Sequence, residues 1–340
     1  MKMSSVFRGG ALALALSSVS FAAGAQETWT IQSLWGAGSI NQQVFQRFAD
    51  NVTAASGGRL TIEALPVGSV VAHNETLDAV GADILQGQHS ASVYFTGRDA
   101  GFGLLGDLNA AYEKPEQMQQ WFYHRGGLEL ARELYAQHNL YYIGPVFWCV
   151  ESIPVSKPVH NVAEFAGVKL RMPEGPSADL FRNIGAAPVT LPGSEVFAAL
   201  ERGVIDGTDW GTLSMNQDLG YHKIAPYPIY PGLHSMPAGE VSVNLDRWNA
   251  LPDDLKALLE MAVRDFNDDM INTIAVADVE AVSKAQADGA EIIDWSPEER
   301  KKLRTEASKV WAQYGEKSDM AKKIYESQVA WLKELQLLDE

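Results

Sequence analysis

Strands and helices alternate regularly in this chain, and this alternation restricts the fold more than any other feature. The pattern predicts strands at Trp29–Leu34 and Leu60–Leu65, separated by a helix at about Gln42–Ala54. A second helix at Thr76–Gln86 and a strand near Ala91–Phe95 complete a βαβαβ unit. Units of this kind imply a mainly parallel sheet covered by helices.

A second unit of the same type begins near Leu140. In its strand at Val168–Met172, apolar residues alternate with Lys169 and Arg171, and a turn and a helix at about Ser177–Phe181 follow. The unit continues with strands at Pro188–Leu191 and Val204–Asp206 and a helix at Glu195–Arg202. Because no flexible linker separates the two units, we expect two lobes that share several chain crossings and move about a hinge.

The sequence pattern changes after Pro252, where long, charged, helical patterns occupy Asp253–Lys284 and Pro297–Leu338. The N-terminal residues 1–25 have the pattern of a secretory signal, in which Lys2 and Arg8 precede an apolar run and small residues. We therefore predict an exported protein whose mature chain starts near residue 26, and no other segment reads as a membrane span.

Composition narrows the possible partners. The formal charge is −16, and removal of the signal, which carries two positive charges, leaves −18. Such an acidic chain has no basic stripe for nucleic acid and is repelled by an anionic membrane surface. With one cysteine, Cys149, an intrachain disulfide is impossible, so stability has to come from a core. The bacterial periplasm fits these properties.

Motifs of common enzymes are missing. The chain has no H-E-x-x-H, C-x-x-C or G-x-S-x-G sequence, and we expect that it is not an enzyme. Gly101–Gly106 matches the dinucleotide pattern G-x-G-x-x-G, but a turn precedes it, so we interpret it as an irregular apolar loop. We expect His89 and His222 to be rim or core residues. The rival class is an exported enzyme acting on a small organic acid, for which no activated nucleophile can be assigned.

Arg171 is the strongest candidate for ligand binding. A guanidinium at a strand end beside a turn can hold a planar carboxylate or sulfonate through two parallel N–H bonds. The pattern alone is equally consistent with a solvated strand residue. From the pattern alone, Asp209 could also be an ordinary turn carboxylate. Trp210 and the pair Tyr94 and Phe95 could equally belong to the core.

From about Trp29 to Leu255 the sequence resembles the solute receptors of TRAP (tripartite ATP-independent periplasmic) transporters, in particular the branch for 2-oxo and 2-hydroxy monocarboxylates. The segments that carry the resemblance include S-G-G-R-L-T-I-E-A-L-P-V-G, G-V-K-L-R-M-P-E-G-P-S-A-D-L-F-R and V-I-D-G-T-D-W. It implies a two-lobe α/β periplasmic binding protein fold (type II-like) with a ligand cleft between the lobes and a long helix spanning both. Lobe I would comprise residues 27–148 and 236–275, and lobe II residues 149–235 and 276–340 with the C-terminal helices.

The resemblance also implies roles for individual residues. Arg171 corresponds to the carboxylate-binding arginine, and Trp210 to a tryptophan that supplies a ring wall and a backbone carbonyl. Tyr94 and Phe95 match the aromatic pair that lines the cleft. The implied partners are a small organic acid and a TRAP membrane permease, with the receptor a monomer or a dimer paired through its C-terminal helices. A receptor that reports its ligand to a signalling partner would have the same cleft.

A bound calcium or sodium ion is implied by the metal-using members, in which Asp209, Trp210 and Glu240 would hold the cation. The chain departs from the branch at V-E-S-I-P around Glu151, where an amide ligand is usual. Three hypotheses follow. Glu151, Asp209 and Glu240 could form an oxygen cage suited to calcium, or they could bind the ammonium group of a zwitterion such as an amino acid or aminosulfonate without a metal. In the third hypothesis Glu151 lies outside the pocket.

Overall fold

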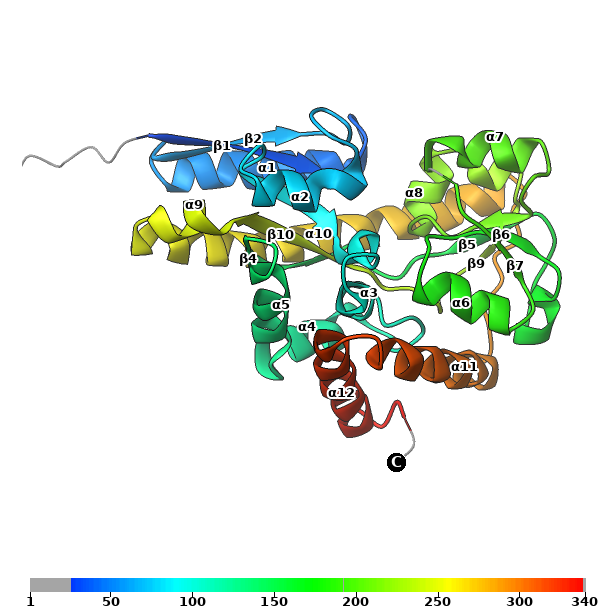
Figure 1. The fold of residues 1–340 in the computed structure, drawn as a ribbon. Helices are drawn as coiled ribbons and strands as arrows, with labels where there is room; N and C mark the ends of the chain where they lie inside the picture. Colours follow the sequence, from blue (N-terminus) through cyan, green and yellow to red (C-terminus); the bar gives the residue numbers. More distant parts are fainter. Residues whose placement is uncertain (1–25, 192, 339–340) are drawn as a thin grey trace, which may run out of the picture.

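The computed structural model describes residues 26–191 and 193–338, and the predicted signal lies outside the described residues. Within this part, the strands form two five-stranded sheets in two bodies that lie side by side (Figure 1). The first sheet has the order β2-β1-β3-β10-β4 and consists of β1 (Glu27–Ser33), β2 (Leu60–Leu65), β3 (Gly87–Ala91), β4 (Leu140–Phe147) and β10 (Ala238–Asn244). The second has the order β7-β6-β8-β5-β9 and consists of β5 (Ile153–Val155), β6 (Lys169–Arg171), β7 (Ala187–Val189), β8 (Gly207–Thr208) and β9 (Tyr227–Ile229).

Helices flank both sheets. Those of the first body are α1 (Ile40–Ala55), α2 (Thr76–Gly81), α3 (Ala100–Gly106), α4 (Pro115–His124), α5 (Gly127–Ala136) and α9 (Leu245–Ala250). Those of the second body are α6 (Pro176–Asn183), α7 (Val196–Glu201) and α8 (Leu213–Asp218). The chain ends with α10 (Asp253–Ala287), α11 (Pro297–Gly315) and α12 (Asp319–Glu334). None of the described helices combines the length and the apolar composition that crossing a bilayer requires.

Each sheet mixes parallel and antiparallel pairs. In the first sheet β1 pairs in parallel with β2 and β3, as the βαβαβ pattern predicts. The chain then leaves this body, builds the second sheet and returns as β10, which inserts antiparallel between β3 and β4. All seven residues of β10 are buried. The chain therefore crosses between the two bodies twice here, once before the strands of the second sheet and once after them.

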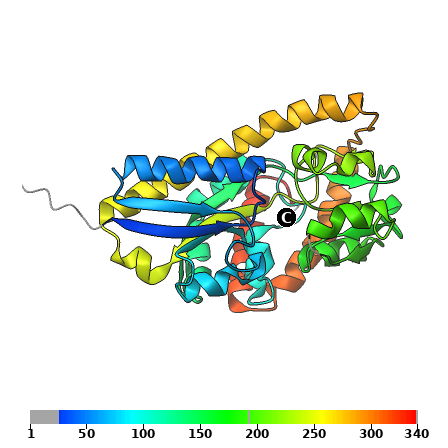
Figure 2. The ribbon, with the colours of Figure 1, turned by 90° about the horizontal axis from the view of Figure 1, so that it is seen from above.

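The long helix α10 connects the bodies. It has 35 residues, packs against α1 and β4 in the first body, and reaches α8 in the second (Figure 2). Helix α11 contacts α6 of the second body and α3 of the first, whereas α12 packs on α3 and α5 of the first body. The division into lobe I (27–148, 236–275) and lobe II (149–235, 276–340) stays a prediction.

Some of the sequence expectations were wrong in detail. Gly101–Gly106 lies within helix α3, not in an irregular loop, and the Asp99 side chain caps this helix by accepting a hydrogen bond from the backbone N–H of Gly101. A Cβ on Gly106 would lie 2.6 Å from Ser92 Oγ, so close packing explains the glycine there. The helical pattern at Pro297–Leu338 forms two helices, because the chain turns after Gly315 and Ser318 caps a new helix.

The strand expected near Ala91–Phe95 lies earlier in the chain. Residues Gly87–Ala91 form β3, and a 3₁₀ helix follows at Ser92–Phe95. The strand contains Gln88, His89 and Ser90, which are polar yet buried at the centre of the sheet. Hydrophobic patterning cannot detect such a strand, because it recognises buried segments by their apolar residues.

Asn267 joins α10 to the end of β4, where the chain leaves the first sheet. Its Oδ1 accepts a 2.8 Å hydrogen bond from the backbone N–H of Phe147. We expect Asn267→Ala to lower the free energy of unfolding by about 1–3 kcal/mol, because it leaves a buried N–H unsatisfied. Urea unfolding followed by tryptophan fluorescence measures this change. Asn272→Ala, at an exposed position of the same helix, is the control, and equal losses in both variants would contradict the role of Asn267.

Candidate functional site

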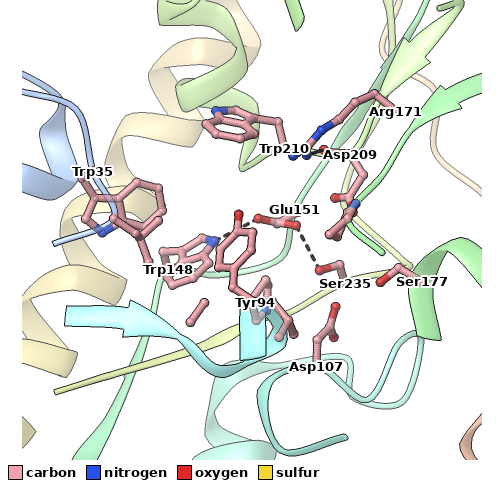
Figure 3. Close-up of a pocket in the computed structure, with 15 residues that line it drawn as sticks. Trp35, Tyr94, Asp107, Trp148, Glu151, Arg171, Ser177, Asp209, Trp210 and Ser235 are labelled. Carbon is pink, nitrogen blue, oxygen red and sulfur yellow. Dashed lines mark hydrogen bonds between the residues drawn. The ribbon is translucent and has the colours of Figure 1, made fainter. Parts of the chain in front are cut away.

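A small cavity, here called the inner chamber, lies between the two bodies (Figure 3). Its volume is about 40 Å³, room for roughly three water-sized groups. The residues that line it come from both bodies and from the crossing segments: Leu34, Trp35, Ala91, Val93, Tyr94, Asp107, Trp148, Glu151, Arg171, Pro173, Ser177, Asp209, Trp210, Ser235 and Pro237. A space of this size fits a ligand head group of a few atoms.

Arg171 is the last residue of β6 and is buried, with 5% of its surface exposed. Its Nε donates to the Leu191 carbonyl at 3.1 Å and its Nη1 to the Asp209 carbonyl at 2.6 Å. The guanidinium carbon lies 5.0 Å from the centre of the Trp210 ring. No carboxylate among the described residues forms an ion pair with this group. Both bonds go to neutral carbonyl groups, so the remaining N–H groups of the guanidinium could bind an anion.

Strand alternation explains this placement. Leu170, the neighbour of Arg171, is fully buried in the core of the second body. Successive side chains of a strand point to opposite faces, so Arg171 is directed away from that core. The backbone N–H of Asp209 bonds to the Arg171 carbonyl at 2.8 Å, which holds the end of β6 beside the segment that carries Trp210.

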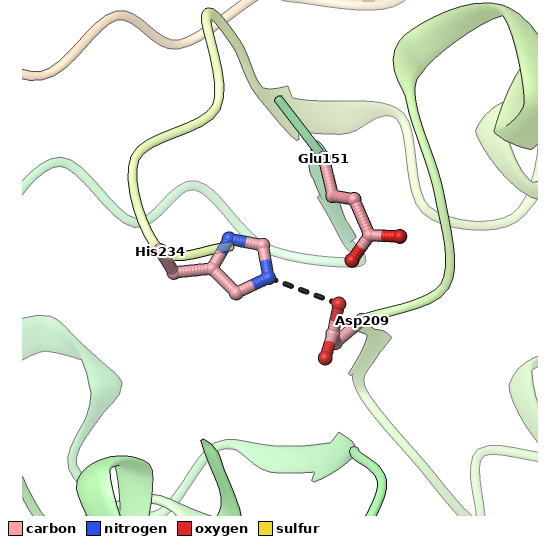
Figure 4. A group of neighbouring side chains, drawn as sticks. All are labelled: Glu151, Asp209 and His234. Carbon is pink, nitrogen blue, oxygen red and sulfur yellow. Dashed lines mark hydrogen bonds and ion pairs between the residues drawn. The ribbon is translucent and has the colours of Figure 1, made fainter. Parts of the chain in front are cut away.

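Glu151, Asp209 and His234 form a buried cluster in which one potential ligand atom from each lies within 4.8 Å of the others (Figure 4). Asp209 Oδ1 is 3.0 Å from His234 Nε2. Glu151 accepts two hydrogen bonds of 3.0 Å, one from Trp148 Nε1 and one from Ser235 Oγ. The sequence positions are far apart, and the strand ends and chain crossings bring them together.

The pKa values of the two carboxyl groups in this cluster are shifted in opposite directions. Burial and the nearby charge of Asp209 raise the pKa of Glu151 well above its ordinary value. Burial also acts to raise the pKa of Asp209, but His234 and Arg171 outweigh it, and the pKa is lowered. Asp107, on the other side of the chamber, has a pKa raised to about 7 by burial. The cluster therefore concentrates oxygen donors that a cation could engage.

Glu240 is not brought to this cluster. It is fully buried within β10, where its Oε1 accepts a 2.9 Å hydrogen bond from Gln88 Nε2 inside the first sheet. Phe95 is also remote from the chamber surface, because its ring packs edge-to-face on Phe102 in the core. Of the expected aromatic pair only Tyr94 lines the inner chamber, alongside Trp210.

Sequence reasoning missed several lining residues. Trp35 and Trp148 meet edge-to-face, with ring centres 4.9 Å apart. Trp35 Nε1 donates to His89 Nε2 at 3.1 Å, so His89 Nδ1 carries the proton that bonds the Glu240 carbonyl at 3.1 Å. His89 is thus a buried core residue that fixes a wall of the cleft. The sequence shows tryptophans at positions 35 and 148, but no local pattern indicates that Trp35 and Trp148 pack against each other.

These features define a two-lobe receptor with an interlobe cleft. Residues 31–318 match the family of bacterial extracellular solute-binding proteins, family 7 (DctP), and the chain belongs to this family. It is a TRAP-type periplasmic solute receptor and not an enzyme. Its two-lobe α/β fold and its long helix α10 confirm the fold predicted from the resemblance.

Solved structures and curated relatives agree with this assignment. A TRAP periplasmic solute-binding protein of Rhodobacter sphaeroides, in an apo open form, is 40% identical, with a TM-score of 0.80 over 92% of this chain and 100% of that one. One from Pseudoalteromonas atlantica with bound sodium and pyruvate is 26% identical, with a TM-score of 0.80 over 92% and 95%. A monocarboxylate 2-oxoacid-binding periplasmic protein of Nostoc is 26% identical over 299 residues, 84% of this chain and 79% of the relative.

The burial of Glu240 predicts a pH dependence of stability. Burial raises the pKa of its carboxyl from the ordinary 4.5 to about 8. Between these values the folded state keeps a proton that the unfolded state releases, so wild-type stability falls as the pH rises. We expect Glu240→Gln, which does not titrate, to be more stable than wild type by about 2–4 kcal/mol at pH 8 and nearly equal at pH 5. Urea unfolding at both pH values measures this. Glu63→Gln, exposed on β2, is the control, and a difference independent of pH would contradict the prediction.

Proposed function

We propose that this receptor captures a small 2-oxo or 2-hydroxy monocarboxylate in the inner chamber and delivers it to a TRAP permease. The observation that carries the proposal is Arg171: a buried guanidinium, oriented by two carbonyls, on the wall of a chamber of head-group size. The relatives named for 2-oxoacids and for pyruvate support the ligand class.

Capture follows from the position of the guanidinium. The ligand carboxylate binds the Arg171 N–H groups that face the chamber, in the geometry that makes arginine–carboxylate pairs strong and directional. Trp210 and Tyr94 form walls that exclude water from this pair. As the lobes close, the local dielectric falls and the attraction between the two charges strengthens. Binding thus stabilises the closed form.

The oxygen donors fit a bound calcium or sodium ion. We assign this role to Glu151, Asp209 and the backbone carbonyl of Trp210, because hard cations prefer carboxylate and carbonyl oxygens. His234, hydrogen-bonded to Asp209, would orient that carboxylate. When bound, the cation would offset the negative charge of the cluster and attract the 2-oxo or 2-hydroxy oxygen. The position of Glu240 gives no support to its expected role as a third carboxylate ligand.

A second candidate ligand class is a zwitterion or aminosulfonate. Three carboxyl groups, Asp107, Glu151 and Asp209, line the inner chamber, whereas Arg171 is the one arginine or lysine among its described lining residues. This excess of carboxyl groups would suit a ligand that carries an ammonium group beside its anionic group. In that case the carboxyl groups contact the ligand directly and no metal is needed.

Partners beyond the ligand follow from the family. A TRAP permease receives the closed receptor, and the net charge of −18 expected for the chain without its signal would steer it toward a basic surface on that permease. The same cleft could serve a sensor, and pairing through the C-terminal helices would give a dimer. Deleting the gene and measuring uptake of the bound acid separates transport from sensing, because uptake persists if the receptor only signals.

Removing the guanidinium tests the clamp. We expect Arg171→Met to weaken pyruvate binding by about 2–5 kcal/mol, which is about thirtyfold or more in Kd, because the carboxylate stays buried and unpaired. Isothermal titration calorimetry measures this change. The control is Arg182→Met, an exposed arginine of α6, which should bind like wild type. Binding by Arg171→Met within a few-fold of wild type would refute the clamp.

The cation assignment is tested by a thermal-shift screen of unfolded and refolded protein in sodium-free, chelator-treated buffer. At a hundred times its Kd, a ligand stabilises the protein by about 2.7 kcal/mol, a shift of several degrees. We expect pyruvate to raise the Tm only with calcium or sodium present, and Glu151→Gln to weaken that requirement or abolish the shift. Glu174→Gln, on the surface, is the control. A metal-independent shift confined to zwitterions would support the second ligand class instead.

A further inference from the structure

Asn216 of α8 is fully buried and is not among the residues that line the inner chamber. Its Nδ2 donates hydrogen bonds of 2.9 Å to the Ser152 hydroxyl oxygen and to the Gly211 carbonyl, and a longer one of 3.4 Å to the Ser152 carbonyl. Ser152 directly follows Glu151 in the chain, and Gly211 directly follows Trp210. One side-chain amide therefore bonds to both segments that bring these residues to the chamber.

The two segments also bond to each other at this point. The backbone N–H of Ser152 donates to the Gly211 carbonyl at 3.0 Å, and the two residues form an isolated antiparallel bridge. The Asn216 amide donates to the same carbonyl and reaches Ser152 as well, so it spans the bridge. A single backbone bond lets two segments shift against each other, whereas a buried side chain bonded to both fixes their separation.

Helix α8 gives this amide a fixed base. Asp278 of the long helix α10 is buried, and its Oδ1 accepts a 2.8 Å hydrogen bond from the backbone N–H of Ser214. This bond satisfies one of the N–H groups that the first turn of a helix leaves without an intrahelical partner. Asn216 follows two residues later. Its position is therefore set by contacts between α8 and α10 that lie outside the chamber.

We propose that Asn216 is a positioning residue for ligand binding. It holds the segment of Glu151 and the segment of Asp209 and Trp210 at the separation at which their oxygen atoms meet around the ligand. Figure 4 shows that Glu151 and Asp209 come from separate segments, with their carboxyl groups close together. The distance between the two backbones decides whether these oxygens converge. This inference rests on the proposed function and adds to it a residue outside the chamber.

Hydrogen exchange of the ligand-free receptor tests the tie between the segments. Mass spectrometry of peptides covering residues 150–155 and 209–213 should show faster exchange in Asn216→Ala, because one backbone bond alone then holds the bridge. Asn244→Ala is the matched control, since Asn244 is also buried and its Nδ2 bonds to the Val80 carbonyl in the first body. Unchanged exchange in Asn216→Ala, or an equal increase in Asn244→Ala, would overturn the proposal.

Calorimetric titration with pyruvate, in buffer with sodium and calcium, tests the consequence for binding. We expect Asn216→Ala to raise the Kd about tenfold, the size typical of losing a residue that orients ligand-binding groups. Asn244→Ala should bind like wild type, and urea unfolding shows whether the two variants lose similar stability. If Asn216→Ala is destabilised but binds like wild type, its role is structural and the proposal is wrong.

A milder variant covers the case in which Asn216→Ala does not fold. Ser152→Ala removes the hydroxyl acceptor and keeps the bond from Asn216 to the Gly211 carbonyl, so the Kd should rise about threefold. An unchanged Kd in this variant would contradict the proposal. If the wild-type receptor binds no 2-oxoacid, the proposed function fails and this role of Asn216 fails with it, even where the exchange result shows that the tie exists.

Discussion

The structure of the cleft depends on one buried positive charge. Arg171 is removed from water, and the carbonyls of Leu191 and Asp209 satisfy part of its hydrogen-bonding capacity without neutralising it. These two carbonyl groups orient the guanidinium, whereas a salt bridge would have occupied its N–H groups and neutralised its charge. The guanidinium N–H groups that these carbonyls do not occupy could therefore bind the carboxylate of the proposed ligand. Hydrogen bonds between Arg171 and Asp209 also hold the segment that carries Asp209 and Trp210, so the guanidinium and the acidic cluster are parts of one arrangement.

The acidic cluster complements this charge. Glu151 and Asp209 share a buried space in which only one of two adjacent carboxyl groups readily ionises, and His234 determines that Asp209 is the one. A cation or an ammonium group can replace the proton that Glu151 retains. The cleft thus holds the Arg171 guanidinium and two acidic side chains in one space, which would suit the proposed ligand with a carboxylate and a neighbouring electron-rich or charged group.

Much of the fold could be predicted, because it follows from local rules. Apolar alternation and helix punctuation located the βα units, and the long helical pattern at 253–284 corresponds closely to α10. Local rules failed where burial involved polar residues or close packing. The strand Gly87–Ala91 is central yet contains Gln88 and His89, and α3 is rich in glycine because neighbouring atoms leave no room for a Cβ. Both depend on contacts with segments distant in sequence.

The sequence by itself determined the class of protein: an exported, acidic, disulfide-free chain with two βα units and an arginine at a strand end. Only the tertiary structure decided which acidic and aromatic side chains share the cleft with that arginine. It joined Glu151, Asp209 and His234, added Trp35 and Trp148, and placed Glu240 inside the first sheet. The physical reason is that the chain crosses between the bodies, and side chains from those crossings meet only when both sheets have formed.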